Sequence, residues 1–373
     1  RAASDDAADL VESIPEERRE RVLDEVEPKE RAAIEELQRY APDTAGGLMQ
    51  KELLRVRADQ TAGEAVETIR RDWNPKIGEV YDIYVVDAEG RVLGRVRNRH
   101  LLIQPRQRPI GEFMLRDVRA VPVSMDQEKI AEIVQDYDLS SIAVVDAEDR
   151  LVGRILVDDI VDVLEEEATE DIHKLGGSEA LGEPYLGVRL RQMLKKRGGW
   201  LALLFLGETL TASAMAYFED EMRRAIVLGM FTPLIISSGG NSGSQATSLI
   251  IRAMALGEVK ASDWWHVMRR EAACGLALGI LLGLIGAGRI LAWESLFGSY
   301  GEHAHLIALT VGATLVGVVL WGTLMGSMLP FLLRRMGFDP ASSSAPFVAT
   351  LVDVTGLVIY FSVALVTLRG TLL

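Results

Sequence analysis

Residues 305–332 read HLIALTVGATLVGVVLWGTLMGSMLPFL and contain no Asp, Glu, Lys or Arg. A helix needs about 20 such residues to cross the ~30 Å hydrocarbon core of a bilayer, so this stretch predicts a membrane span. Four further apolar runs of similar length lie in the same half of the chain, at 200–218, 226–251, 270–292 and 346–368. The sequence therefore predicts an all-α transmembrane bundle of five helices over residues 199–373.

The charged connectors between these runs predict how the bundle is oriented. Basic residues gather on one side, at 195–197, 252–270 and 334–335, whereas the connectors 218–224 and 293–305 are richer in acids. Lys and Arg are enriched on the cytoplasmic side of membrane proteins. We therefore expect a multi-pass protein of the cell (inner or plasma) membrane, with its first half in the cytoplasm and its C-terminus outside.

The first half of the chain has a different composition. Residues 1–175 hold 41 of the 54 acidic residues and 25 of the 40 basic ones. Such a negative region is expected to be soluble, and its charge disfavours nucleic acid as a partner and favours cations. The single cysteine, Cys274, excludes a disulfide framework or a Cys-rich metal site within one chain.

An internal repeat of about 60 residues occupies residues 50–168. The segment VVDAE is followed by RVLGR in the first copy, at 85–95, and by RLVGR in the second, at 144–154. Each copy has the pattern helix, strand, turn, strand, helix. This arrangement resembles a tandem pair of CBS domains, an α/β regulatory module, with repeats at 50–108 and 109–168.

Two segments flank the repeat. Residues 1–49 have the pattern of short helices, broken near Pro15 and Pro28. After the repeat, residues 158–171 hold eight acids and neither Lys nor Arg, and residues 169–198 are expected to form a helix that connects to the first span. From composition alone, such an acidic run is typical of a solvated helix face.

Asp353 lies in the middle of the last apolar run, in PFVATLVDVTG at 346–356. A carboxylate at membrane depth is costly and normally faces a polar pathway or a partner. No Lys or Arg lies at a similar depth, whereas a hydrated Mg²⁺ ion uses one or two carboxylates and keeps several waters. One Asp per subunit, doubled across a two-fold axis, would suit this ion. The alternative is a packing Asp bonded to a neighbouring Ser or Thr.

A polar run, SSGGNSGSQ at 237–245, follows Pro233 and is expected to interrupt the second span. Its small residues and freed carbonyls either line a water-filled path or form a face for helix packing. The pore-lining candidates are Gly240, Asn241, Ala349 and Thr350.

Several motifs together resemble the MgtE family of Mg²⁺ channels and transporters. Besides the two CBS copies, they are PDTAGGLM at 42–49, EATEDI at 167–172, GGNSG at 239–243, MLPFLLRR at 328–335, DP at 339–340 and VATLVDVTG at 348–356. They extend from residue 42 almost to the end of the chain, and as a set they are highly specific.

The resemblance implies a homodimer in the lipid bilayer, with a pore between the two transmembrane halves and Asp353 holding hydrated Mg²⁺. It implies that cytosolic Mg²⁺ binds acidic residues near the connecting helix and closes the pore. Residues 1–49 then correspond to the last part of a longer helical N-terminal domain. The positions that match the family's sensing acids are Asp126, Glu128, Asp138, Asp159, Asp162, Glu167, Glu170, Asp171 and Asp339.

An adenine nucleotide is a second ligand that the CBS resemblance raises. CBS pairs that bind one usually carry Ser or Thr two residues before an acid that meets the ribose. The corresponding stretches here, RNRH at 97–100 and LVDD at 156–159, lack the hydroxyl. The sequence therefore leaves nucleotide binding open and gives it no positive support.

Three hypotheses for the function follow. The leading one is a Mg²⁺-selective channel that cytosolic Mg²⁺ closes. The second is a divalent-cation transporter coupled to H⁺ or Na⁺, with Glu208 of the first span as the coupling carboxylate; Glu208 is alternatively an interfacial residue bonded to a nearby Thr. The third is a membrane-bound metal sensor. An enzyme is not expected, because no P-loop, zinc motif or nucleophile–base spacing is present.

Overall fold

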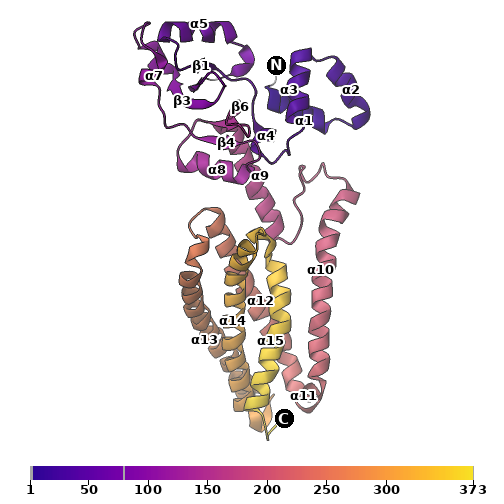
Figure 1. Cartoon of the computed structure of the whole chain (residues 1–373). Coiled ribbons are helices and arrows are strands. Elements are labelled where there is room, and N and C mark those ends of the chain that lie inside the picture. Colours follow the sequence, from indigo (N-terminus) through magenta and orange to yellow (C-terminus); the bar gives the residue numbers. More distant parts are fainter. Residues whose placement is uncertain (1–2, 79, 373) are drawn as a thin grey trace. The chain divides into compact units, whose positions relative to one another are not determined.

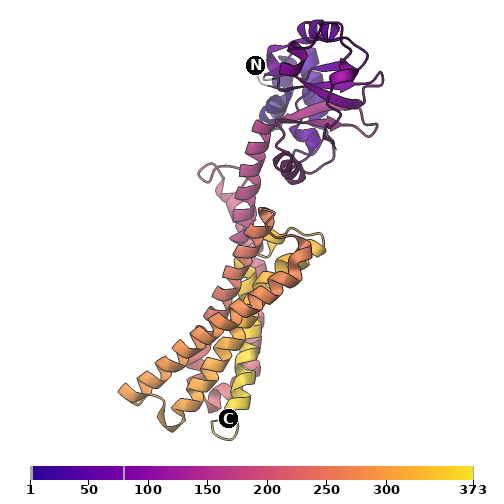
Figure 2. The same cartoon turned by 90° about the vertical axis from the view of Figure 1, so that its left-hand side faces the viewer.

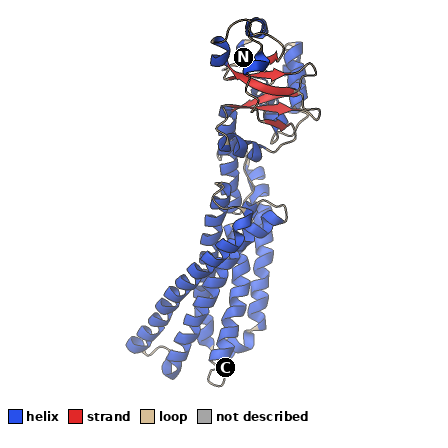
Figure 3. Cartoon of the chain, turned by 60° about the vertical axis from the view of Figure 1, so that its left-hand side comes forward, coloured by secondary structure: helices blue, strands red, loops and turns tan. Residues whose placement is uncertain are grey.

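The computed structural model describes residues 3–78 and 80–372, and the chain divides into two compact units, Arg1–Glu167 and Ala168–Leu373 (Figure 1). The first unit is a mixed α/β structure, and the second consists of long helices. Strands are drawn only in the first unit (Figure 3). The fold class expected from the sequence, a CBS-like α/β pair followed by long apolar helices, is confirmed.

The first unit begins with short amphipathic helices. They are α1 (Ser4–Ser13), α2 (Glu16–Asp24), α3 (Pro28–Leu37) and the one-turn α4 (Ala45–Leu48). Pro28 is the first residue of α3, where its missing N–H costs no helical hydrogen bond. The buried side chains of Val11 and Leu37 pack in one apolar cluster with Ile142 and Ile155 of the second repeat. The N-terminal helices are therefore part of the same core as that repeat.

The two repeats have the same topology. The first contains β1 (Arg55–Arg57), α5 (Ala62–Asp72), β2 (Asp82–Val86), β3 (Val92–Arg97) and α6 (Asn98–Leu102). After α7 (Ile110–Phe113), the second contains β4 (Ala120–Pro122), α8 (Gln127–Asp136), β5 (Ser141–Val145), β6 (Leu151–Leu156) and the start of α9 (Val157–Leu175). Each sheet has a parallel pair followed by an antiparallel pair. The internal repeat is confirmed, although the three-residue strands β1 and β4 were not predicted.

The two sheets meet at a small buried cluster that includes Tyr84, Ala143 and Leu151. The Tyr84 hydroxyl and the Ser141 hydroxyl are 3.0 Å apart and hydrogen-bonded across this contact. Arg154 is only 2% exposed, and its guanidinium donates to the carbonyl of Ile77. Large buried side chains thus fill the contact between the repeats.

The prediction of one connecting helix over residues 169–198 is wrong in its bounds. Helix α9 begins at Val157, directly after β6, and ends at Leu175. Residues 176–189 are turns and irregular chain, and α10 (Leu190–Tyr217) then begins. Gly176 and Gly177 explain the end of α9, because Gly177 has a φ of 73°, in the left-handed region that terminates helices.

The second unit is a bundle of long helices (Figures 1 and 2). After α10 and the short α11 (Glu219–Arg224), they are α12 (Ile226–Ala255), α13 (Trp264–Phe297), α14 (Ala304–Arg335) and α15 (Ala345–Thr367). Among the described residues, α10, α13, α14 and α15 are long and apolar enough to span a membrane. Helix α12 does not meet that criterion because its polar run lowers its hydropathy, but it packs against α14 and α15 inside the bundle.

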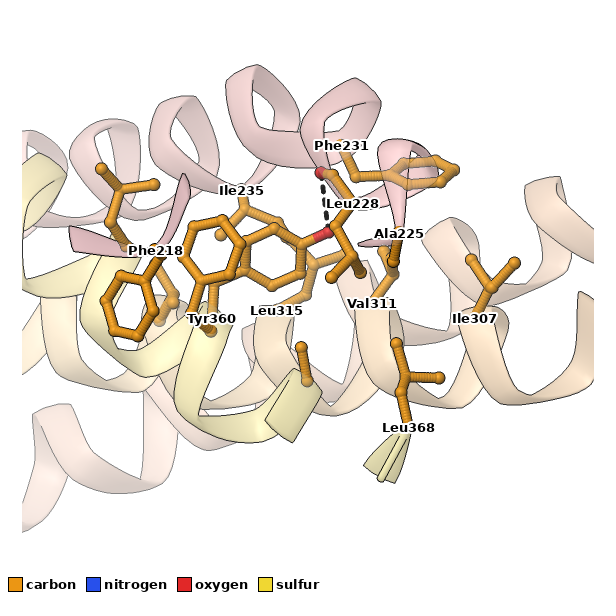
Figure 4. Close-up of a cluster of buried hydrophobic side chains, with 14 of the residues drawn as sticks. Phe218, Ala225, Leu228, Phe231, Ile235, Ile307, Val311, Leu315, Tyr360 and Leu368 are labelled. Carbon is orange, nitrogen blue, oxygen red and sulfur yellow. Dashed lines mark hydrogen bonds between the residues drawn. The ribbon is translucent and has the colours of Figure 1, made fainter. Parts of the chain in front are cut away.

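The core of the bundle is an apolar cluster shared by α12, α14 and α15 (Figure 4). Leu228, Val311 and Tyr360 are fully buried in it. The Tyr360 hydroxyl donates a hydrogen bond of 2.9 Å to the Leu228 carbonyl, drawn dashed in Figure 4. This bond satisfies the polar end of a buried aromatic side chain.

The polar run 237–245 does not interrupt the second span, contrary to the expectation. Helix α12 continues through Pro233 and the whole run. A Cβ on Gly326 would lie 2.1 Å from the Gly243 carbonyl oxygen, and one on Gly322 would lie 2.4 Å from the Gly239 carbonyl oxygen. Glycines on α14 opposite the run are therefore needed for the close packing of α12 against α14.

Candidate functional site

Asp353 lies on α15, on the side that meets α12. A Cβ built on Gly240 would be 3.5 Å from the Asp353 Oδ1 and 3.5 Å from the Ala349 Cβ. The structure thus brings together Asp353 and two of the predicted lining residues. None of the ion pairs formed within residues 3–78 and 80–372 includes Asp353. Its half-buried carboxylate is available for a cation.

The other two lining candidates lie differently. Asn241 is exposed, and its amide donates to the Ser237 hydroxyl at 3.4 Å, one turn earlier on α12. Thr350 packs against α10, where a Cβ on Gly207 would lie 2.9 Å from the Thr350 Cγ2.

Glu208, which follows Gly207 on α10, is exposed and close enough to Asp353 for their charges to interact. The structure therefore supplies a second carboxylate near Asp353.

A second group of acids lies in the first unit, where α1 meets α9. Asp159 accepts hydrogen bonds from the Leu156 amide at 3.0 Å and from the Gln50 amide at 3.4 Å. Burial raises the pKa of Asp159 to about 7, and the nearby charge of Asp5 adds to this rise. A carboxyl group with this pKa is held in surroundings that disfavour its negative charge.

Asp5 is the most buried acid of this group, with only 7% of its surface exposed. Burial raises its pKa to about 6, while hydrogen bonding, including that of Gln50, opposes the rise. No donor among the described residues reaches its buried Oδ1. A little further along α1, burial and the charges of acids that include Glu12 and Glu166 raise the pKa of Asp9.

Asp5 and Asp9 were not predicted as part of a site. Their spacing of four residues places both on one face of α1, and this is the local signal that could have singled them out. It gives no indication of which surface they face, however. The partner surface is α9, far along the chain.

The remaining predicted acids of the first unit are spread over α8 and α9. Asp126 caps α8, where its carboxylate accepts from the Glu128 amide at 3.1 Å. Asp138 and Asp162 are exposed, and Asp138 has a left-handed φ of 48°. The Glu167 carboxylate accepts a hydrogen bond of 2.6 Å from the side chain of Gln127.

The predicted acids of the second unit meet a lysine that the sequence did not single out. Lys174, near the end of α9, pairs with both Glu170 and Asp339. Asp171 is half-buried on the same helix. Within the part of the chain that the structure describes, no group of three or more His, Cys, Asp or Glu residues is placed to hold a metal ion.

Comparison with known proteins gives a consistent assignment. Residues 232–363 match the MgtE divalent cation transporter family, residues 2–43 the MgtE intracellular N domain, and residues 45–104 and 110–166 the CBS domain. The chain is 40% identical over 369 residues to a magnesium transporter MgtE of Thermus thermophilus, which covers 98% of this chain and 80% of that protein. It is 32% identical over 344 residues to one of Enterococcus faecalis, covering 91% and 73%.

A solved structure described as the cytosolic domain of the Mg²⁺ channel MgtE in complex with ATP is 38% identical. It covers 43% of this chain and 66% of that chain, with a TM-score of 0.41. The relatives are transporters, so the expectation that the chain is not an enzyme is confirmed. The chain, a membrane protein with a cytosolic N-terminal region and several spans, belongs to the MgtE family of magnesium transporters.

Proposed function

We propose that this magnesium transporter is a Mg²⁺-selective channel whose pore is closed by cytosolic Mg²⁺. Asp353 is the pore acid in this proposal. It lies on a helix in the bundle, beside the small residues Gly240 and Ala349, without an ion pair among the described residues. Small neighbours leave room for an ion that keeps several of its waters.

The observation that carries the proposed gate is the burial of like charges where α1 meets α9. Asp5 and Asp159 both have pKa values raised by burial, and one oxygen of Asp5 is buried without a donor among the described residues. A contact between helices would normally avoid placing a buried carboxylate and a half-buried one within range of each other's charge. A divalent cation relieves both the repulsion and the missing hydrogen bond, because carboxylate oxygens are the ligands that Mg²⁺ prefers.

Gating then follows from a shift in population. Without Mg²⁺, repulsion among the acids of α1 and α9 disfavours the compact arrangement. With Mg²⁺ bound between them, the compact arrangement is favoured, to the extent that the ion binds it more tightly than the open one. The transported ion thereby limits its own entry.

The proposed homodimer is supported by the surface of α10. In the single chain, its apolar side chains face outward, with Leu201 55% exposed and Phe205 70% exposed. Such a helix needs lipid or a second copy of the chain beside it. Two copies would also bring two Asp353 residues to one pore.

A coupled transporter is the second candidate, and the nearness of Glu208 to Asp353 is the observation that favours it. Mg²⁺ uptake into liposomes that contain the purified protein distinguishes the two. The channel predicts uptake with no H⁺ or Na⁺ gradient and inhibition when Mg²⁺ is raised on the cytoplasmic side. Uptake that requires a proton gradient and fails in Glu208→Gln would instead establish coupling.

A further inference from the structure

Lys174 lies between two acids that we assign to Mg²⁺ sensing. Its Nζ is 2.6 Å from the Asp339 Oδ2, and it also pairs with Glu170, one turn earlier on α9. The three side chains are about one-third exposed, at 29% for Lys174, 33% for Glu170 and 37% for Asp339. One ammonium group therefore occupies both carboxylates.

The Asp339 carboxylate has little freedom to turn away from this lysine. Its Oδ1 accepts a hydrogen bond of 2.8 Å from the Ala341 amide and caps the short helical turn Pro340–Ser342. Oδ2, the oxygen that does not cap this turn, is the one that Lys174 holds. A Mg²⁺ ion that binds Asp339 through this oxygen competes with the ammonium for it.

The end of α9 is also anchored in the second unit by contacts that do not involve these acids. A Cβ on Gly177 would lie 2.8 Å from the Trp200 Nε1 and 3.2 Å from the Pro346 Cγ, so the turn after α9 fits closely between α10 and α15. Lys196 of α10 donates to the Leu181 carbonyl at 2.8 Å. The contact between Lys174 and Asp339 thus occurs where the end of α9 meets the first turn of the helix that carries Asp353.

We propose that the Lys174 ammonium is a tethered cation that occupies Glu170 and Asp339 when Mg²⁺ is scarce and leaves them when Mg²⁺ binds. This inference rests on the proposed gate and adds a competitor to it. The competitor sets how much cytosolic Mg²⁺ the two acids need before they bind it. It also keeps the end of α9 attached to the loop at Asp339 when no ion is present.

Charge explains why the two cations exclude each other. The two carboxylates carry two negative charges, which one Mg²⁺ neutralises completely and one ammonium only in part. An ammonium and a Mg²⁺ ion on the same two carboxylates would repel each other within a few ångströms. Burial acts to lower the pKa of Lys174, but the hydrogen bonds with Asp339 and Glu170 outweigh it and hold this pKa above its usual value. The lysine therefore leaves as a cation and not by losing its proton.

The test measures how fast each lysine amine of the full-length protein reacts with an amine-acylating ester, by mass spectrometry, with and without Mg²⁺ at matched ionic strength. Lys174 should react about fivefold faster with saturating Mg²⁺, as expected when screened ion pairs are broken. The exposed Lys195 of α10 is the control and should not change. The double variant Glu170→Gln, Asp339→Asn should react at the faster rate without Mg²⁺ and should not respond to it.

Mg²⁺ uptake by the same preparation separates this inference from the proposed gate. If cytoplasmic Mg²⁺ inhibits uptake while the Lys174 rate stays constant or falls, the tethered-cation inference is overturned and the gate stands. If the Lys174 rate rises as expected but uptake is not inhibited, the ion exchange is supported and the proposed gate is overturned. If neither responds to Mg²⁺, both are overturned.

Discussion

Asp5 and Asp159 come from α1 and α9, and the negative charge of Asp5 raises the pKa of Asp159. The amide of Gln50 contributes hydrogen bonding to both carboxyl groups. The two like charges repel each other beside an apolar cluster that includes Val11 and Ile160, and the buried guanidinium of Arg154 offsets part of this repulsion. The proposed gate depends on this contact being unfavourable without a cation.

Asp159→Asn should stabilise the contact between α1 and α9 in the absence of Mg²⁺. The amide keeps an oxygen that can accept the Leu156 N–H but carries no charge, so the gain should be on the order of 1 kcal/mol after solvent screening. Hydrogen exchange of the α1 amides measures it as slower opening. The same variant should lose most of the protection that Mg²⁺ gives to wild type. Unchanged Mg²⁺ protection would contradict a role for Asp159 in sensing.

Acid should partly replace Mg²⁺ at this contact. The pKa values of Asp5 and Asp159 are about 6 and 7 in the folded protein, against 3.8 for an ordinary Asp. The folded state therefore binds protons more tightly, and its stability rises as the pH falls from about 8 towards 5. Hydrogen exchange of α1, corrected for the intrinsic pH dependence, should show this gain without Mg²⁺. In a double variant with Asn at both positions, the stability of α1 should not change with pH over this range. A pH dependence equal to that of wild type would assign the gain to other titratable groups.

Gly326→Ala should destabilise the transmembrane bundle strongly. The added Cβ would lie 2.1 Å from the Gly243 carbonyl oxygen, so α12 and α14 must move apart at a cost of about 3 kcal/mol. Gly229→Ala on α12 is the matched control, because a Cβ there has nothing within 4 Å. Thermal unfolding in detergent measures both. Equal unfolding temperatures would mean that the two helices are not in this close contact.

Glu208→Gln should leave Mg²⁺ uptake without a proton gradient close to that of wild type. Glu208 is exposed on α10, and in the channel proposal its charge only adds to the field near Asp353. Uptake should change by a small factor, as expected for one screened charge, about threefold or less. Abolished uptake would favour the coupled transporter.

Much of the fold could be predicted because it depends on local pattern. Strands β2 and β5 each end in the Val pair that begins a VVDAE repeat, and the long apolar runs predict the spans from length alone. The polar run 237–245 in α12 led to a wrong prediction of a broken span. A run rich in Gly and Ser is typical both of a helix face that packs closely and of a break in a helix. Only the partner helix, with Gly322 and Gly326 opposite, distinguishes them.

The candidate sites could be predicted only in part. Asp353 was identifiable because a carboxylate within an apolar run is unusual by itself. Asp5 was not, because its significance comes from burial against a helix that begins at Val157. Lys174 was missed for the same reason, since it pairs with Asp339, 165 residues further along the chain. Sequence spacing shows which residues share a helix face but not which distant surface they meet.

Mg²⁺ uptake by Asp353→Asn tests the central claim most directly. The purified variant is reconstituted in liposomes beside wild type and Glu208→Gln, and its oligomeric state and unfolding temperature are measured in the same preparation. The account predicts that Asp353→Asn remains folded and dimeric and takes up no more Mg²⁺ than empty liposomes do. Uptake equal to that of wild type would contradict the assignment of Asp353 as the pore acid.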